Sequence, residues 1–139
     1  MRVFVFLFFF ISCSANSQIE NLISNKWIID VVAMEPVIEA RLNSDPNYSN
    51  LPDSEKQIAI QTALNQIAKS NVEYKADGTY YSETSSKKKN GKWRWDKESN
   101  KLFVNVEGKE LTYKIISVSK NELKLENSDG IKLYFKPMI

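Results

Sequence analysis

The chain contains no histidine and only one cysteine, Cys13. The absence of imidazole excludes Ser-His and Cys-His catalysis, histidine metal ligands and the most common general base. A single cysteine cannot form an internal disulfide or a zinc cluster. The sequence also lacks a glycine-rich phosphate-binding loop. We therefore expect that the protein is not an enzyme and that it uses no metal and no cofactor.

The chain also lacks an excess of charge of one sign, because 19 basic and 17 acidic side chains nearly balance. A net charge of +2 is too small to indicate nucleic acid or a strongly acidic partner. Asp45, Asp53 and Glu55 share a polar segment, but their spacing does not follow the rhythm of EF-hand calcium ligands. We expect a monomer that does not bind nucleic acid.

A long hydrophobic run is present at the N-terminus, from Val3 to Ile11. This run is about half of the roughly 20 residues that a membrane-spanning helix needs, which favours a signal sequence. The small residues Ala15 and Ser17 fit a cleavage site, and they predict a signal over residues 1–17. The domain that remains, residues 18–139, is the size of one folded unit.

Cys13 allows a second route of processing. Ile11-Ser12-Cys13 resembles a bacterial lipobox, in which a signal over residues 1–12 is removed and the cysteine is lipidated. Lipidated Cys13 would then tether the protein to a membrane. Both routes predict an exported protein, either a secreted one or a lipoprotein of the outer membrane or periplasm.

From Asn71 to Phe135 the sequence alternates with the period of two that is typical of half-buried strands. Turn signals such as Asp77-Gly78 and Asn90-Gly91 divide this region into hairpins. With one more strand at Trp27, they predict an antiparallel up-and-down barrel of about eight strands, the number at which a sheet can close. The alternation slips at Ile115-Ile116, which predicts a β-bulge.

A helical insert, residues 35–70, is expected between the first and second strands. The β-branched Val31 and Val32 favour extension of the first strand. A short helix is then expected over Glu35 to Asn43, with Pro36 tolerated in its first turn. A loop follows up to Asp53, because this stretch is rich in turn formers.

A second helix of the insert is predicted from about Ser54 to Lys69. Ser54 and Gln57 have the spacing of a capping box. Apolar residues recur along one helical face, and this face predicts a lid or plug at one barrel opening. The residues assigned to the lid are Ile60, Leu64 and Ile67.

The inward side chains of the barrel predict non-catalytic binding of a small apolar or amphipathic ligand. The alternative is a barrel packed shut by its own side chains, which would serve as a protein-interaction or structural module of the cell envelope. Both alternatives need the same inward alternation. The residues expected to line the barrel are Tyr74, Tyr80, Trp93, Trp95, Val104, Tyr113, Leu125 and Leu133.

The densest positive patch is Lys87-Lys88-Lys89, with Lys92 and Arg94 nearby. Such a patch is typical of a solvated hairpin tip that keeps a sheet edge soluble. A functional interpretation is contact with an anionic glycan or a membrane head group. Binding of that kind would weaken as ionic strength rises.

Four segments carry a recognisable pattern: Leu22 with Lys26-Trp27, the run from Glu73 to Tyr80, Gly91-Lys92-Trp93, and Leu133 to Lys136. Together they resemble the lipocalin-like families of Bacteroidetes-type exported proteins. The resemblance implies a ligand-binding barrel in which Trp27 closes one end against Lys136. The helical insert is similar in position to the lid of intracellular fatty-acid-binding barrels.

Overall fold

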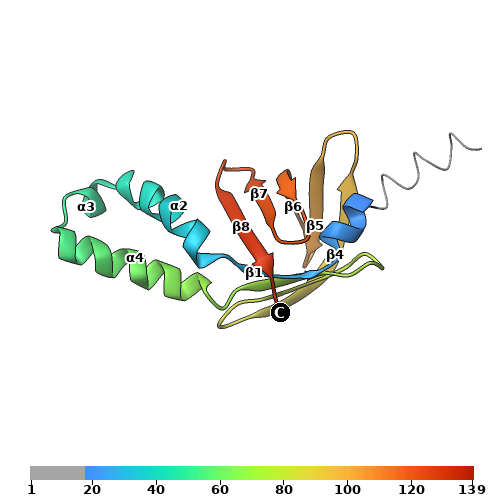
Figure 1. Cartoon of the computed structure of the whole chain (residues 1–139), viewed down its shortest axis with the longest axis horizontal. Coiled ribbons are helices and arrows are strands. Elements are labelled where there is room, and N and C mark those ends of the chain that lie inside the picture. Colours follow the sequence, from blue (N-terminus) through green and yellow to red (C-terminus); the bar gives the residue numbers. More distant parts are fainter. Residues whose placement is uncertain (1–17) are drawn as a thin grey trace, which may run out of the picture.

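A computed structural model describes residues 18–139, which form a closed antiparallel barrel of eight strands (Figure 1). Each strand pairs with the next one along the chain, and the last strand pairs with the first. The predicted up-and-down barrel is therefore confirmed. The strands are β1 (Lys26–Ile29), β2 (Asn71–Tyr74), β3 (Thr79–Glu83), β4 (Lys88–Asp96), β5 (Lys101–Val106), β6 (Lys109–Val118), β7 (Leu123–Asn127) and β8 (Lys132–Pro137).

Most hairpin turns lie where the sequence signals placed them. Gly78, Gly108 and Gly130 each adopt a positive φ, the conformation that favours glycine in tight turns. The register between β6 and β7 shifts between Ile115 and Ser117. The β-bulge that the sequence predicted is therefore present.

The predicted turn at Asn90-Gly91 is wrong, because both residues lie inside β4. Gly91 pairs with Tyr80 on one side and with Val106 on the other. A Cβ atom at Gly91 would lie 2.0 Å from the carbonyl oxygen of Asn105. Glycine here permits close approach of two strands, a role that looks like a turn signal in the sequence.

The first strand is shorter than predicted, and the first helix begins earlier. β1 ends at Ile29, and the Asp30 carboxylate accepts a hydrogen bond of 3.2 Å from the backbone N–H of Ala33. This N-cap starts α2 (Val31–Asn43), so the two valines that favoured a strand are helical. Pro36 consequently lies inside the helix and not in its first turn.

The rest of the insert also differs in detail from the prediction. The expected loop contains a short helix, α3 (Pro46–Ser49). The second long helix, α4 (Asp53–Ile67), begins after Pro52 without a side-chain cap, so the predicted capping box is wrong. Asp53 and Glu55 place negative charge in the first turn of α4, where the helix dipole favours it.

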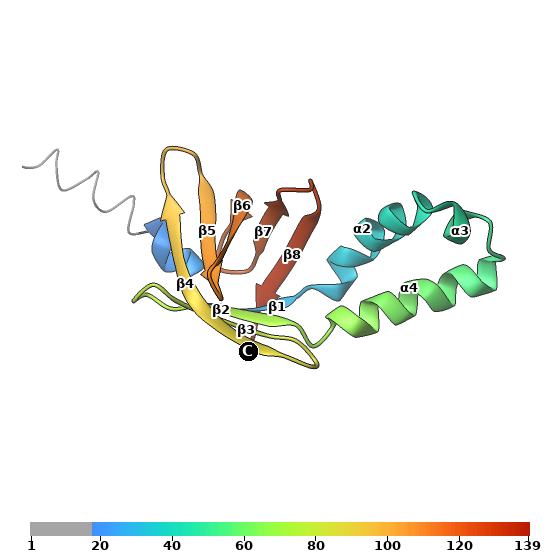
Figure 2. The same cartoon turned by 180° about the vertical axis from the view of Figure 1, so that it is seen from behind.

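The insert projects from one end of the barrel as a helical hairpin (Figures 1 and 2). We call this the insert end, and the barrel end near the helical turn of residues 18–23 the N-terminal end. α2 is anchored to β8, since the backbone N–H of Asp30 donates to the carbonyl of Tyr134 at 2.9 Å. Among residues 18–139, no helix has the length and apolar character needed to span a bilayer.

Buried apolar side chains fill the N-terminal end of the barrel and the space between the helices of the insert. In the barrel the most deeply buried are Trp27, Leu102, Val104, Leu123 and Leu125. A smaller group, Met34, Tyr48, Ile60 and Leu64, is buried within the insert. The described residues include no buried charged side chain.

Candidate ligand-binding pocket

The insert end of the barrel is hollow. A cavity of about 680 Å³ lies beside the start of β2, the tip of the β3–β4 hairpin and the β5–β6 turn. Its wall comes from strands β1 to β6 and β8, their connecting turns and the last residue of α4. The lining residues are Ile29, Ile67, Ser70, Asn71, Val72, Tyr80, Ser82, Glu83, Thr84, Lys87, Lys89, Val106, Glu107, Lys109, Leu111, Tyr113, Leu133 and Phe135.

The inner wall of this pocket is mainly apolar. Leu111 on β6 and Leu133 on β8 are half-buried, while Val106 and Phe135 are 8% and 7% exposed. These side chains alternate with outward-facing polar residues, which is why the strands can be apolar inside and soluble outside. Such a wall suits the apolar part of a small molecule.

Two tyrosines, Tyr80 and Tyr113, bring hydroxyl groups into the apolar wall. Burial raises the pKa of Tyr80 to about 12, and it raises the pKa of Tyr113 as well. Both phenols are therefore protonated at neutral pH. They are neutral side chains that can donate or accept hydrogen bonds inside the pocket.

An aromatic cluster lies behind Tyr80, nearer the N-terminal end. The ring of Tyr74 lies 5.3 Å from that of Tyr80 and 5.6 Å from that of Trp93, measured between centroids. The indole N–H of Trp93 donates to the carbonyl of Lys75 at 2.7 Å. Burial, with smaller contributions from Tyr80 and Tyr113, raises the pKa of Tyr74 well above its ordinary value.

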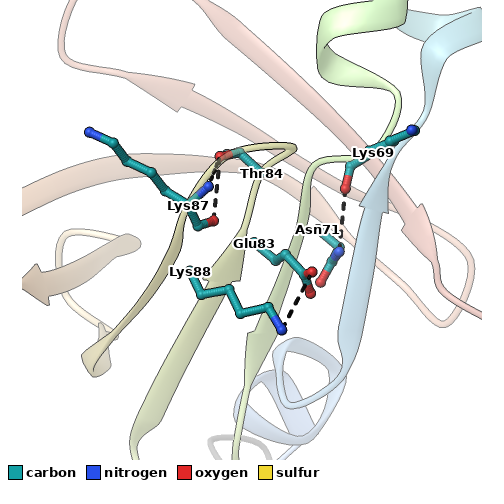
Figure 3. Close-up of polar contacts among 6 residues, drawn as sticks. All are labelled: Lys69, Asn71, Glu83, Thr84, Lys87 and Lys88. Carbon is teal, nitrogen blue, oxygen red and sulfur yellow. Dashed lines mark hydrogen bonds and ion pairs between the residues drawn. The ribbon is translucent and has the colours of Figure 1, made fainter.

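The rim carries the basic residues that the sequence singled out. Lys87 and Lys89 line the pocket, together with Lys109 from the start of β6. Lys88 does not line it, and its ammonium lies 3.9 Å from the carboxylate of Glu83 (Figure 3). The three consecutive lysines therefore lie on two faces of one hairpin, with Lys87 and Lys89 at the pocket and Lys88 outside it. The sequence alone does not show this division.

The hairpin tip that holds these lysines is closed by local hydrogen bonds. The backbone N–H of Thr84 donates to the carbonyl of Lys87 at 2.9 Å, and the hydroxyl of Thr84 accepts from the N–H of Lys87 at 3.3 Å (Figure 3). Nearby, the Asn71 amide donates to the carbonyl of Lys69 at 3.4 Å. These bonds fix the backbone of the rim on both sides of β3.

Three of the eight predicted lining residues line the pocket: Tyr80, Tyr113 and Leu133. Five others do not line it. Tyr74, Trp93, Val104 and Leu125 are buried in the core of the barrel, and Trp95 is half-buried with its indole N–H donating to Asn100 at 3.2 Å. The alternation places all of these side chains inside the barrel, but it does not distinguish residues that line the cavity from residues packed in the core.

The residues assigned to a lid are also divided. Ile67 lines the pocket, whereas Ile60 and Leu64 do not and are buried in the insert with Met34 and Tyr48. The expectation that all three face the barrel opening is therefore wrong. Their apolar face is explained by packing between α2 and α4, because a helical hairpin needs a core of its own.

Closure of the N-terminal end differs from what the resemblance implied. Trp27 is fully buried, and its indole N–H donates to the carbonyl of Ile23 at 3.0 Å. Lys136 is exposed on the strand face opposite to that of Phe135. The helical turn of residues 18–23 covers Trp27 in place of the lysine.

Several pocket residues were not among the eight named from the sequence, including Lys109, Val106 and Leu111. Their signal was present, since they belong to the inward set of β5 and β6. Cys13, the predicted lipidation site, lies outside the described residues. Within the described part of the chain, no group of three or more His, Cys, Asp or Glu side chains is arranged to hold a metal ion.

The fold and pocket define a closed antiparallel barrel with one packed end and one lined, hollow end. Comparisons with protein-family models and with curated proteins gave no match. The structure is similar to the crystal structure of a DUF4847 family protein from Bacteroides vulgatus, with a TM-score of 0.56. The two share 16% sequence identity, and the similarity covers 83% of this chain and 93% of that one. At this identity the similarity shows the fold alone.

Proposed function

We propose that the protein binds one small amphipathic molecule, without catalysis, in the hollow end of the barrel. The observation that carries this proposal is the cavity of about 680 Å³. Its size is within the range of roughly 300–1,000 Å³ that is common for small-molecule sites. A barrel packed shut over its whole length would have no such space.

The chemistry of the wall supports an amphipathic ligand over a purely apolar one. Leu111, Leu133 and Phe135 offer apolar contact, while the hydroxyls of Tyr80 and Tyr113 offer a few polar contacts among them. Pockets of this composition orient a ligand through sparse polar groups. In this respect the protein would act as a lipocalin-like carrier, as the sequence resemblance implied.

We place this binding outside the cytoplasm. The apolar run from Val3 to Ile11 and the small residues that follow it are the basis for export. The protein is then a monomer that is secreted or is tethered through lipidated Cys13. Mass spectrometry of the mature N-terminus separates these forms, since only one of them carries an acyl mass. A mature chain that keeps residues 1–17 would contradict export.

The proposal is tested by titrating the protein with a neutral lipophilic dye. Leu111→Trp would fill part of the cavity, and we expect it to weaken dye binding about tenfold or more. Ile116→Trp is a matched control, because Ile116 lies on the same strand and is 41% exposed outside the barrel. Equal effects of both substitutions would contradict binding inside the barrel. Absence of any dye binding by the unmodified protein would do so as well.

Native mass spectrometry of protein purified from its host tests the same proposal without a chosen probe. We expect a non-covalent adduct that organic extraction removes. A clean mass of the polypeptide, together with a failed dye titration, would leave the proposal without support and favour the alternative below.

The insert supports a second candidate function, a protein-interaction module of the envelope. Val32 on α2 is 78% exposed and Ile58 on α4 is 67% exposed, although both are large apolar residues. Ile58 shares a helical face with Gln61 and Asn65, which lie beside Val32 in a shallow depression. Cross-linking in intact envelopes tests this function: a partner lost in Val32→Ser/Ile58→Ser supports it, and an unchanged pattern contradicts it.

A further inference from the structure

We propose that the pocket selects ligands that carry an anionic head group, which the rim lysines hold at the insert end of the barrel. This inference rests on the proposed function, since it assumes that the apolar part of the ligand occupies the cavity. It names the class of ligand: a single amphiphile with a carboxylate or phosphate head.

Strand register places two of these lysines on the inner face of the barrel. Lys89 is paired with Ser82 and lies two residues from Gly91 and four from Trp93, so it shares their inward face. Lys109 is paired with Val106 and precedes Leu111 on the inward face of β6. Both lysines therefore stand at the pocket mouth, where the inward-facing rows of β4 and β6 reach the rim.

The charges of these lysines are not neutralised by the protein. Within residues 18–139 the ion pairs are Lys88–Glu83 and Lys124–Glu122. Lys87, Lys89 and Lys109 thus have no ion-pair partner in the described part of the chain. A cluster of unpaired ammonium groups beside an apolar cavity attracts an anion that can bring its own apolar chain.

The acidic residues of the rim do not reverse this sign. Glu83 is exposed, and it forms its ion pair with Lys88, which does not line the pocket. Glu107 lies in the β5–β6 turn with a φ of 54° and is exposed. Three lysines against these two carboxylates, one of them already paired, leave a positive rim.

The positive charge is confined to one side of the mouth. Lys87, Lys89 and Lys109 come from the β3–β4 tip and the start of β6, while Ile67, Ser70 and Asn71 form an uncharged side near α4. Below the rim, the Tyr80 phenol is neutral at physiological pH, as any phenol with a pKa of 10 or above is, so it does not repel an anion. A ligand is expected to lie with its head between the lysines and its chain along the apolar wall.

The inference is tested with four probes that share a decyl chain: decanoate, decyl phosphate, decanol and decyltrimethylammonium. Each is titrated against bound neutral dye, below its micelle concentration, with the unmodified protein and with Lys89→Gln/Lys109→Gln. For each probe, the ratio of its affinities for the two proteins does not depend on how hydrophobic the probe itself is. We expect the substitutions to weaken decanoate or decyl phosphate about fivefold to twentyfold. Decanol should change less than about twofold.

Lys92→Gln is the matched control, because Lys92 lies on the same strand as Lys89, is exposed and does not line the pocket. It should leave all four affinities within about twofold. Added salt should reduce the affinity difference between the unmodified protein and Lys89→Gln/Lys109→Gln for the anionic probes. Decyltrimethylammonium should bind more tightly to the double variant. Decanoate and decyl phosphate differ only in the head group. The probe that loses more affinity in the double variant identifies whether the lysines prefer a carboxylate or a phosphate.

The outcomes separate the two proposals. If the dye and decanol bind but the double substitution changes all probes equally, selection of an anion is contradicted and ligand binding stands. If no probe and no dye binds the unmodified protein, the proposed function itself fails. Binding of anionic phosphatidylglycerol vesicles without uptake of decanoate would also overturn the inference, because the lysines would then bind a surface and not a single amphiphile.

Discussion

The two ends of the barrel are built from the same alternation, yet one is packed and the other is hollow. At the N-terminal end, Trp27, Tyr74 and Trp93 are buried and both indole N–H groups have backbone acceptors. At the insert end, the inward positions hold Val106, Leu111 and other side chains that leave about 680 Å³ between them. The two ends differ in coverage: a helical turn covers one opening, while the insert projects away from the other (Figure 1).

The packed region and the proposed binding region are therefore separated along the barrel axis. A barrel of about eight strands has an interior that side chains can fill or that can hold one small ligand. Close packing at one end supplies stability, and incomplete packing at the other leaves space for a ligand. A substitution in one region therefore tests whether the other region depends on it.

The largest effect is expected from Trp27→Ala in the packed end. Removal of a fully buried tryptophan and of its bond to Ile23 should lower the free energy of unfolding by about 3–5 kcal/mol. That is much of the stability of a typical domain. Urea denaturation followed by far-ultraviolet circular dichroism measures the loss.

Leu133→Ala is the control for the hollow end. Leu133 is half-buried and already borders the cavity, so we expect a loss of about 1–2 kcal/mol. Equal losses for Trp27→Ala and Leu133→Ala would mean that the two ends are packed alike, and the comparison would fail.

The second largest effect is expected from Leu64→Asp, which separates the insert from the barrel. Leu64 is 7% exposed between the helices, so the carboxylate would be buried without a partner at a cost of about 2–4 kcal/mol. We expect the helical signal to fall while the barrel stays folded. Hydrogen exchange of β4–β6 amides against α4 amides measures this, and joint loss of protection in both would contradict it. Gln61→Asp, on the exposed face of α4, is the control.

The barrel itself was predictable from the sequence because its signals are local. Alternation, the turn at Asp77-Gly78 and the slip at Ile115-Ile116 each report on a few neighbouring residues, and the structure agrees with them. The presence of two helices in the insert, a short one and a longer one, was predictable for the same reason, although the first helix is longer than predicted. These features depend on backbone conformation and on which face is apolar.

The pocket was only partly predictable because it depends on contacts between distant residues. Tyr80 and Trp93 have the same inward pattern, but only the first lines the cavity. Val31 and Val32 favour a strand, yet the cap at Asp30 makes them helical. Gly91 resembles a turn residue because the approach of Asn105 is invisible in the sequence.

Gly91→Ala is expected to have a smaller effect, about 1–3 kcal/mol of lost stability. The new Cβ would meet backbone atoms of Asn105, which cannot rotate away as a side chain can. Strands β4 and β5 must then separate at the level of the pocket. Thermal unfolding measures the loss, and dye affinity should change with it because Val106 lines the cavity.

Gly130→Ala is the control for glycine replacement. Its φ of 78° disfavours alanine, but a Cβ there meets nothing within 4 Å. We expect about 1 kcal/mol of lost stability and no change in dye affinity. Similar dye affinities for Gly91→Ala and Gly130→Ala would indicate that the strand contact at Gly91 does not shape the pocket.

The smallest effect is expected from the tyrosine that faces the cavity. Burial is the main reason that the pKa of Tyr80 rises from about 10 to about 12, and the protonated phenol is therefore favoured by folding. The contribution is fully present below the unfolded pKa and is lost as pH rises through about 12. Between about pH 9 and pH 12, the unmodified protein should lose on the order of 1 kcal/mol more stability than Tyr80→Phe, which cannot ionise. Urea denaturation at both pH values measures this difference, with Tyr81→Phe on the outer surface as the control. If Tyr80→Phe and Tyr81→Phe behave alike, Tyr80 is as well solvated as a surface ring, and the hollow end is a water-filled funnel without the apolar wall that ligand binding requires.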